Sequence, residues 1–247
     1  MNLKVVTTDA GGTGMDPDVL VIAATPDELS WAGDLPPFCE TRLGRLVVDF
    51  CVTGPGQVNT AYALGRVLSG LTPRLILSVG IGGAYPSSGL FPGDIAVATT
   101  EVDADWGVEP IPPEIQPRPI LVPRVRLPGA NLNFFIPLSK SHARSLLLSS
   151  CEFCNAAEGP FVTSSTVTAT EKRARLMEEL YGAICENMEG YAAAQVAMEE
   201  GIPFAEIRGI SNMAGPRDLS AWKLKEAIKA AGRGAKGFLV KLEAERR

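Results

Sequence analysis

Four short segments of the sequence carry groups suited to chemistry, and each follows an apolar run. They are residues 25–28 (TPDE), 80–83 (GIGG), 187–190 (NMEG) and 208–212 (RGISN). Two of them contain a glutamate, and a carboxylate either takes a proton as a general base or accepts hydrogen bonds from sugar hydroxyls. The sequence therefore places acid–base and diol-binding groups at the ends of predicted strands.

Glu28 fits two roles. Thr25 can act as an N-cap, Pro26 as the first helical residue and Glu28 as the capping-box partner. A glutamate just after a strand is also well placed to act as a general base. One turn can serve both roles, and the spacing alone leaves both open.

The glycines at 80–83 predict a close approach of backbone N–H groups to a ligand. A dinucleotide-binding fingerprint is excluded, because the spacing is not G-x-G-x-x-G and Pro86 and Pro92 interrupt the helix that must follow. A simple tight turn remains the alternative.

Glu189 and Asn212 also have structural alternatives. Glu189 begins a predicted helix, where a carboxylate interacts favourably with the helix dipole. It also has the acceptor-only chemistry that suits the hydroxyls of a ribose. Ser211 and Asn212 belong to residue types that often shape loops.

Composition excludes several classes of protein. With 46% hydrophobic residues, 21% charged residues and a net charge of −5, the chain is predicted to fold and not to bind nucleic acid. No apolar run reaches the roughly 18 residues of a membrane span, and the N-terminus lacks the apolar core of a signal peptide, so a cytoplasmic protein is expected. One histidine, His142, and a single C-x-x-C at 151–154 give no pattern for a metal site.

These segments need a scaffold of alternating strands and helices. Seven strands are expected, at residues 19–25, 45–54, 74–83, 93–102, 159–169, 183–188 and 202–211. Helices are expected in segments 57–70, 141–150, 170–182, 189–201 and 219–245, and the Pro-rich segment 108–138 is expected to be a long loop. The order predicts one three-layer α/β domain over residues 18–247 with a largely parallel sheet, after a flexible leader at 1–17. In such sheets ligands bind at the carboxyl ends of the strands.

Five motifs, taken in order, resemble a known family. They are VIAATPDEL, SVGIGGAYPSSGLFPGDIAVATTEVDAD, VTSSTVTATEKRARL, ENMEGYAAAQVA and RGISNMAGPRD. From Val19 to Leu242 the chain resembles the superfamily of nucleoside phosphorylases and nucleoside hydrolases, which includes methylthioadenosine/S-adenosylhomocysteine nucleosidase. Within it the chain is most similar to the futalosine hydrolases of an alternative menaquinone pathway. The resemblance implies a mixed, partly closed sheet flanked by helices, in place of a largely parallel one.

The resemblance implies a role for each matching residue. Glu28 would activate the attacking water, Glu189 would hold the ribose hydroxyls with Met188 packed against the sugar, and Asn212 would hydrogen-bond the purine. The other substrate contacts fall to Gly82, Gly83, Thr166, Val167 and Ser211. No metal or organic cofactor is implied, and a homo-oligomer is expected.

Two departures from the superfamily bear on the reaction. Asn212 stands where the adenine-specific nucleosidases have aspartate, and its amide suits hypoxanthine. The loops after the early strands lack a phosphate-binding arginine, which favours water as the nucleophile. The expected reaction is hydrolysis of the N-glycosidic bond of futalosine to hypoxanthine and dehypoxanthine futalosine. A purine nucleoside phosphorylase, a methylthioadenosine nucleosidase and a non-catalytic nucleoside-binding protein remain alternatives. Arg118, Arg124 and Arg126 are expected to be solvated loop residues rather than substrate contacts.

Overall fold

A computed structural model describes residues 4–5, 16–33, 38–108, 118–127 and 130–246 of the chain. Its strands are β1 Lys4–Val5, β2 Val19–Ala23, β3 Phe38–Leu43, β4 Leu46–Val52, β5 Ile76–Ala84, β6 Ile95–Asp103, β7 Gly107–Val108, β8 Arg118–Pro119, β9 Val125–Leu127, β10 Ala130–Leu132, β11 Phe135–Pro137, β12 Ala156–Thr163, β13 Cys185–Asn187 and β14 Phe204–Met213. Its α-helices are α1 Gln57–Leu68, α2 Lys140–Cys151, α3 Glu171–Tyr181, α4 Gly190–Glu199 and α5 Leu224–Glu245, with 3-10 turns η1 Asp27–Ala32, η2 Pro86–Ser88 and η3 Leu219–Ala221.

The main sheet is mixed and closes on itself in part. Its strands follow the order β1-β3-β4-β2-β5-β13-β12-β6-β11, and β14 pairs with both β5 and β6. The pairs β2–β5, β5–β14 and β12–β6 are parallel, whereas β13–β5 and β14–β6 are antiparallel. Strands β5, β13, β12, β6 and β14 therefore form a closed ring. The mixed, partly closed sheet is confirmed, and the largely parallel sheet expected from strand order alone is wrong.

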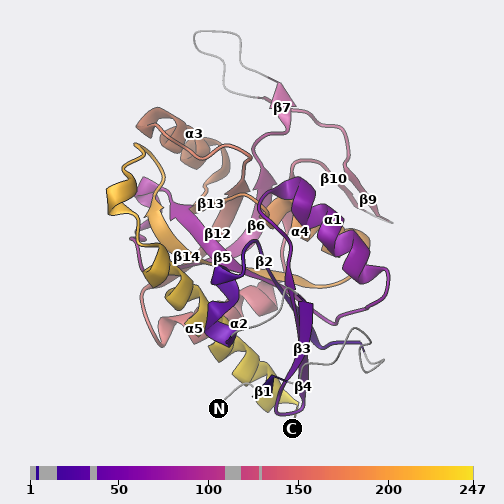
Figure 1. The fold of residues 1–247 in the computed structure, drawn as a ribbon. Helices are drawn as coiled ribbons and strands as arrows, with labels where there is room; N and C mark the ends of the chain where they lie inside the picture. Colours follow the sequence, from indigo (N-terminus) through magenta and orange to yellow (C-terminus); the bar gives the residue numbers. More distant parts are fainter. Residues whose placement is uncertain (1–3, 6–15, 34–37, 109–117, 128–129, 247) are drawn as a thin grey trace.

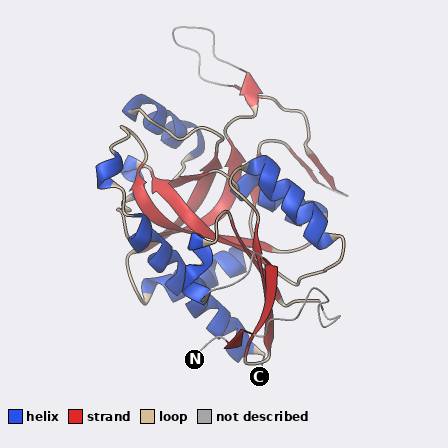
Figure 2. Cartoon of the chain, viewed as in Figure 1, coloured by secondary structure: helices blue, strands red, loops and turns tan. Residues whose placement is uncertain are grey.

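Helices cover both faces of this sheet, which gives three layers (Figures 1 and 2). One core cluster joins the sheet to α2 and α5, with Leu146, Phe238 and Leu239 among its buried residues. A second cluster joins the opposite face to α1 and α4, with Leu64 and Tyr191 buried in it. Each helix thus buries one apolar stripe on the sheet, as the helical periodicity predicts.

The expected strands are confirmed as elements, although the one expected at 159–169 ends at Thr163 of β12. The glycines at 80–83 lie inside β5, as the strand expected at 74–83 has them, and the alternative of a simple tight turn is wrong, because β14 pairs alongside Gly82 and Gly83. The segment 108–138 contains the short strands β8 to β11 where described, since β11 pairs with β6 and β9 with β10. The leader expected at 1–17 lies mostly outside the described residues, although β1 pairs with β3.

In the part of the chain that the structure describes, no helix has the length and apolar character that crossing a bilayer requires.

Strand β14 packs so closely on α5 that one position tolerates only glycine. A Cβ on Gly209 would overlap the backbone carbonyl of Ala227 in α5, and backbone cannot move aside as a side chain can.

We expect Gly209→Ala to lower the free energy of unfolding by about 3 kcal/mol, the upper range for overpacking, measured by urea denaturation. The matched control is Gly65→Ala in α1, where nothing lies within 4 Å of the new Cβ. That variant should gain about 0.5–1 kcal/mol from helix propensity. Equal stability of the two variants would contradict the packing argument.

Candidate active site

A cavity of about 700 Å³ opens where β5, β13 and β14 end beside η1 and the start of α5. The cavity is lined by every residue that the sequence analysis assigned to catalysis or substrate contact: Glu28, Gly82, Gly83, Thr166, Val167, Met188, Glu189, Ser211 and Asn212. The structure therefore brings together residues spread over most of the chain.

Glu28 is held by both of its carboxylate oxygens. One oxygen, Oε1, accepts a hydrogen bond from the backbone N–H of Ile81 at 3.0 Å, and Oε2 accepts from the N–H and hydroxyl of Thr25 at 2.9 and 3.0 Å. Glu28 accepts from the Thr25 N–H as in a capping box, but Pro26, not Thr25, is the N-cap and the Thr25 hydroxyl donates to Glu28. Glu28 also faces the cavity. Three hydrogen bonds fix a carboxylate that keeps one lone pair free.

Glu189 is the second fixed carboxylate. Its Oε1 accepts from the backbone N–H of Gly56 at 2.9 Å, and its Oε2 lies 3.2 Å from Nη1 of Arg208. The start of α4 is held by Asn187, whose Oδ1 accepts from the N–H groups of Glu189 and Gly190 at 2.9 and 2.7 Å. The end of β13 therefore sets the orientation of the glutamate that follows it.

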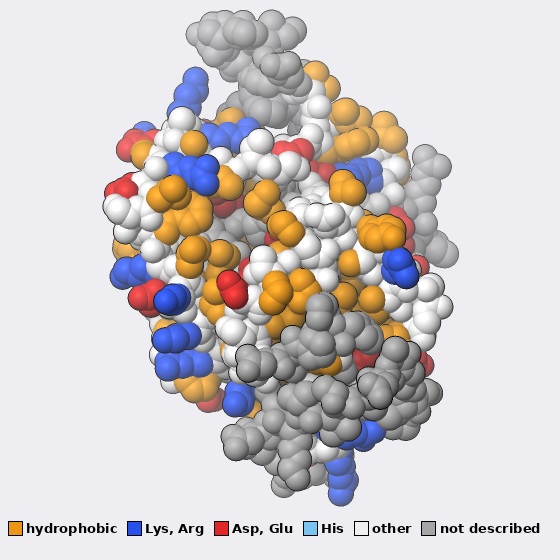
Figure 3. All heavy atoms as spheres, viewed as in Figure 1, with side chains coloured by type: hydrophobic (Ala, Val, Ile, Leu, Met, Phe, Trp, Pro, Cys, Tyr) orange, Lys and Arg blue, Asp and Glu red, His pale blue; other side chains and the backbone are white. Residues whose placement is uncertain are grey.

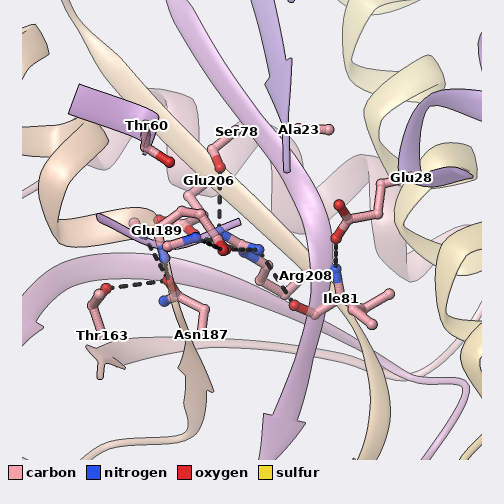
Figure 4. A network of polar contacts seen from close by, with 12 residues as sticks. Ala23, Glu28, Thr60, Ser78, Ile81, Thr163, Asn187, Glu189, Glu206 and Arg208 are labelled. Atoms are coloured by element: carbon pink, nitrogen blue, oxygen red, sulfur yellow. Dashed lines mark hydrogen bonds and ion pairs between the residues drawn. The ribbon is translucent and has the colours of Figure 1, made fainter. Parts of the chain in front are cut away.

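Arg208 begins the segment 208–212 singled out in the sequence, but no role was expected for it. Its guanidinium, 3% exposed, lies between Glu28 on one side and Glu189 and Glu206 on the other (Figure 4). Its Nε donates to Glu206 Oε1 at 2.8 Å, and its Nη1 also donates to the carbonyl of Ile81 at 3.3 Å. Burial opposes the charge, but Glu206, Glu189 and Glu28 together raise the pKa of Arg208 above its usual value. Two charged residues, Glu206 and Arg208, inside the mostly apolar strand FAEIRGIS were the available signal.

Gly80 makes room for this arrangement. A Cβ at Gly80 would lie 2.5 Å from Arg208 Nη1 and 2.7 Å from Glu28 Oε1. Because Gly80 has no side chain, the guanidinium of Arg208 and the carboxylate of Glu28 can both lie against β5. In the described structure, this close approach is the clearest reason for glycine in the segment.

A second carboxyl pair lies behind the site. Glu101 and Glu206 are fully buried, Glu101 accepts from Thr163 at 2.7 Å and Asn187 at 2.8 Å, and Oε2 of Glu206 has no other hydrogen-bonding atom beside it. An added Cβ at Gly190 would meet both Oε1 of Glu101 and Oε2 of Glu206, so these two carboxyl oxygens lie close together. Burial and the charge of Glu206 raise the pKa of Glu101 well above its usual value. Of the two, Glu101 is the carboxyl whose pKa shift favours the protonated form, while Oε1 of Glu206 accepts from Nε of Arg208.

The far end of the cavity holds Asn212 and Glu186. The hydroxyl of Ser211 donates to Oδ1 of Asn212 at 2.8 Å, which turns the amide nitrogen outward to the carbonyl of Met213 at 3.1 Å. Glu186 accepts from the Tyr85 hydroxyl and the Thr168 N–H, both at 3.2 Å. Burial raises the pKa of Glu186, while these hydrogen bonds oppose the rise. Sequence analysis did not single out Glu186, because it lies inside a predicted strand.

Ser211 is an extra residue in β14. Ile210 pairs with Gly82 and Asn212 with Gly83, so the register shifts by one residue at this point. Such a bulge turns neighbouring side chains away from strict alternation. Ser211 and Asn212 consequently both line the cavity.

Among the described residues, three cationic side chains line this cavity, those of Arg208, Lys225 and Lys229. Within the described part of the chain, no group of three or more His, Cys, Asp or Glu side chains is arranged to hold a metal ion.

The fold is a mixed, partly closed sheet flanked by helices, with two buried carboxylates in a cavity at one edge. Comparison with known proteins identifies the family. The model of the phosphorylase superfamily matches residues 13–242, so the chain belongs to this superfamily. Two curated relatives are named futalosine hydrolase. That of Streptomyces coelicolor is 35% identical over 188 residues, 74% of each chain, and that of Thermus thermophilus is 34% identical over 199 residues, 79% of this chain and 82% of the relative.

Solved structures share the fold at lower identity. The native futalosine hydrolase of Helicobacter pylori has a TM-score of 0.75 and 16% identity, covering 90% of this chain and 97% of its own. The methylthioadenosine/S-adenosylhomocysteine nucleosidase of Neisseria meningitidis, bound to methylthio-immucillin-A, has a TM-score of 0.74 and 17% identity, with 90% and 98% covered. The three-layer fold with its mixed sheet flanked by helices is thereby confirmed.

The raised pKa of Glu101 predicts a free energy of unfolding that falls as pH rises. The raised pKa means that folded Glu101 keeps a proton that the unfolded chain loses above about pH 4.5, so stability is full below that pH and declines as pH rises towards the folded pKa. One retained proton corresponds to about 1.4 kcal/mol per pH unit. Glu101→Gln should remove this slope from urea unfolding measured between pH 5 and 8.

The slope, not the absolute stability, is the decisive readout. An amide nitrogen at position 101 can donate to Glu206 but cannot also accept from Asn187, so a pH-independent loss of about 1 kcal/mol is expected as well. Glu158→Gln on exposed surface is the control and should leave the slope unchanged. Identical slopes in wild type and Glu101→Gln would show that Glu101 is ionised in the folded protein.

Proposed function

We propose that this protein hydrolyses the N-glycosidic bond of futalosine, releasing hypoxanthine and dehypoxanthine futalosine. One observation carries the proposal: two buried carboxylates, Glu28 and Glu189, are held on either side of Arg208 in one cavity. The relatives named futalosine hydrolase, 34–35% identical over about three quarters of the chain, support futalosine as the substrate.

The two carboxylates suit the two needs of this reaction. Cleavage passes through an oxocarbenium-like ribosyl cation, and water must attack the face opposite the base. Glu28 takes the proton of that water, because its backbone and threonine contacts fix it at the cavity wall. Glu189 accepts hydrogen bonds from the 2′- and 3′-hydroxyls, and Met188 packs against the sugar.

Arg208 serves this chemistry by position and charge. It neutralises Glu189 and Glu206 directly, so that carboxylates can remain ionised in a buried cavity. Its guanidinium is engaged by these partners and by backbone, which leaves it poorly disposed to bind a free phosphate. Together with the absence of arginine from the loops after the early strands, this favours water over phosphate as nucleophile.

The leaving base contacts the end of the cavity near Asn212. The amide nitrogen of Asn212, oriented by Ser211, donates to O6 or N7 of hypoxanthine. Gly82 and Gly83 bring backbone close to the base and sugar, and Thr166 and Val167 line the opposite wall. No metal or organic cofactor has a part in this mechanism.

The proposal extends to the setting of the enzyme. We place it in an alternative menaquinone pathway in the cytoplasm, where its five free cysteines would stay reduced. We also propose a homo-oligomer, because α1 exposes Val58 and Tyr62 at 83% and 66%. Apolar side chains so exposed on one helix are typical of an interaction surface.

One assay separates the candidate reactions. Purified protein is incubated with futalosine, inosine and methylthioadenosine, with and without phosphate, and the free base is measured. Hypoxanthine release from futalosine without phosphate is expected. Release that depends on phosphate would identify a phosphorylase, preference for methylthioadenosine would identify the nucleosidase, and binding without base release would identify a non-catalytic binder.

Glu28→Gln should keep the fold and lose about 10²–10⁴-fold in kcat, because an amide cannot take the proton of water. Asp27→Asn, a charge change in the same turn, is the matched control and should retain activity. Thermal unfolding checks that both variants are folded. If the Gln variant turns over futalosine as fast as wild type does, Glu28 only closes its turn.

Asn212→Asp should shift the preference from the 6-oxo to the 6-amino purine. An ionised carboxylate has no proton for O6 or N7, whereas a protonated one can donate to N7 and accept from the amino group of adenine. A mismatched buried polar contact costs about 1–3 kcal/mol, so the ratio of kcat/KM for futalosine and its 6-amino analogue should change at least about tenfold. An unchanged ratio in a folded variant would place base choice at another residue of the cavity.

A further inference from the structure

Arg124 of the Pro-rich segment does not supply a free cation to the cavity. Arg124 forms an ion pair with Asp103 and lies over the rings of Trp106 and Tyr191, each 4.7 Å from its guanidinium carbon. The expectation that Arg124 is a solvated loop residue is therefore wrong, because ring stacking and an ion pair hold it. The side chains of Arg118 and Arg126 lie outside the described residues.

The start of α5 supplies cations instead. Lys225 and Lys229 line the cavity together with Leu224 and Ile228, so the first two turns of α5 turn one mixed face towards it. Trp222, just before the helix, lines it as well. In the space-filling view, Lys and Arg side chains gather over α5 beside hydrophobic ones (Figure 3).

These two lysines lack a carboxylate among the described residues. No ion pair or hydrogen bond joins either ammonium group to an acidic side chain there. Like charges four residues apart on a helix repel each other. An anion between them would relieve that repulsion, and the adjoining Trp222 would pack against an apolar or aromatic group attached to it.

A backbone hydrogen bond fixes the start of α5 relative to the residues proposed to contact the base. The N–H of Lys223 donates to the carbonyl of Ser211 at 2.8 Å, which ties the start of α5 to the strand that carries Asn212. In the proposed function the base lies near Asn212 and the ribose near Glu28 and Glu189. The α5 face is then the largest continuous part of the lining left for the part of the nucleoside beyond its 5′ carbon.

We infer that Trp222, Lys225 and Lys229 form a subsite for an aromatic carboxylate attached at the 5′ end of the nucleoside. The inference rests on the proposed function, since futalosine carries a carboxyphenyl ketone at that position. A cavity of about 700 Å³ lies in the range that encloses a drug-sized ligand and is larger than a purine ribonucleoside fills. The phenyl ring packs on Trp222, Leu224 and Ile228, and the carboxylate meets the ammonium groups.

The test removes the two charges and varies the charge of the substrate. For the double variant Lys225→Gln/Lys229→Gln, we expect kcat/KM for futalosine to fall at least about tenfold, the effect of 1.4 kcal/mol of lost binding. The values for futalosine methyl ester and for inosine, which lack the carboxylate, should change less than about twofold. Lys236→Gln, the same charge change farther along α5 and outside the cavity lining, is the control and should behave as wild type.

A second variant separates the ring from the charge. Trp222→Ala should lower kcat/KM for futalosine and for its methyl ester alike, and leave inosine unchanged. Equal losses on futalosine and ester in the lysine variant, or no loss on either, would overturn the subsite.

Direct binding distinguishes failure of the subsite from failure of the proposed function. The probe is 3-acetylbenzoate, followed by NMR at millimolar concentration, with acetophenone and inorganic phosphate in parallel. We expect binding of 3-acetylbenzoate by wild type, weaker binding by the lysine variant and little binding of acetophenone. If wild type binds 3-acetylbenzoate but releases no base from futalosine, the subsite stands and the proposed reaction fails. Preferential binding of phosphate at the lysines, or no binding of 3-acetylbenzoate, overturns the subsite.

Discussion

The structure depends on one buried cation. A guanidinium removed from water is stable only when it is paired and hydrogen-bonded, and Arg208 meets this condition through Glu189, Glu206 and backbone. Two neighbouring positions adapt to it: Gly80 lacks a side chain and so leaves space for the guanidinium, and Glu101, buried beside Glu206, has a raised pKa. The charge balance of the whole cavity thus follows from a single residue in the middle of β14.

The closed part of the sheet explains why so many groups converge there. Strands β5 and β14 run parallel, so their carboxyl ends meet at the same edge, and antiparallel β13 ends where α4 begins beside them. One oxygen of Glu28 and one of Glu189 are held by backbone N–H groups, those of Ile81 and Gly56. Carboxylates fixed in this way need little reorganisation when charge develops on a substrate.

Much of the cavity was predictable from the sequence because its residues directly follow apolar runs. Glu28, Glu189 and Asn212 stand at such positions, and their match to a known family gave them roles to test. Arg208 was given no role, and Glu101 and Glu186 were not singled out, because each lies inside a strand where apolar neighbours suggest ordinary core. Strand direction was equally hidden: the order of elements suggests parallel pairing, and only the paired ladders show that β14 lies antiparallel to β6. Lysines on a helix normally indicate a solvated face, so Lys225 and Lys229 gave no signal until the fold placed them at the cavity.

The bulge at Ser211 separates two tasks within one strand. Before it, Arg208 lies in regular pairing opposite Gly80, and after it Asn212 faces Gly83 in a shifted register. A substitution at position 212 can therefore alter what the cavity accepts without disturbing the ladder that holds the arginine. Substrate preference is free to diverge among descendants of such a chain, while the charged centre is inherited unchanged.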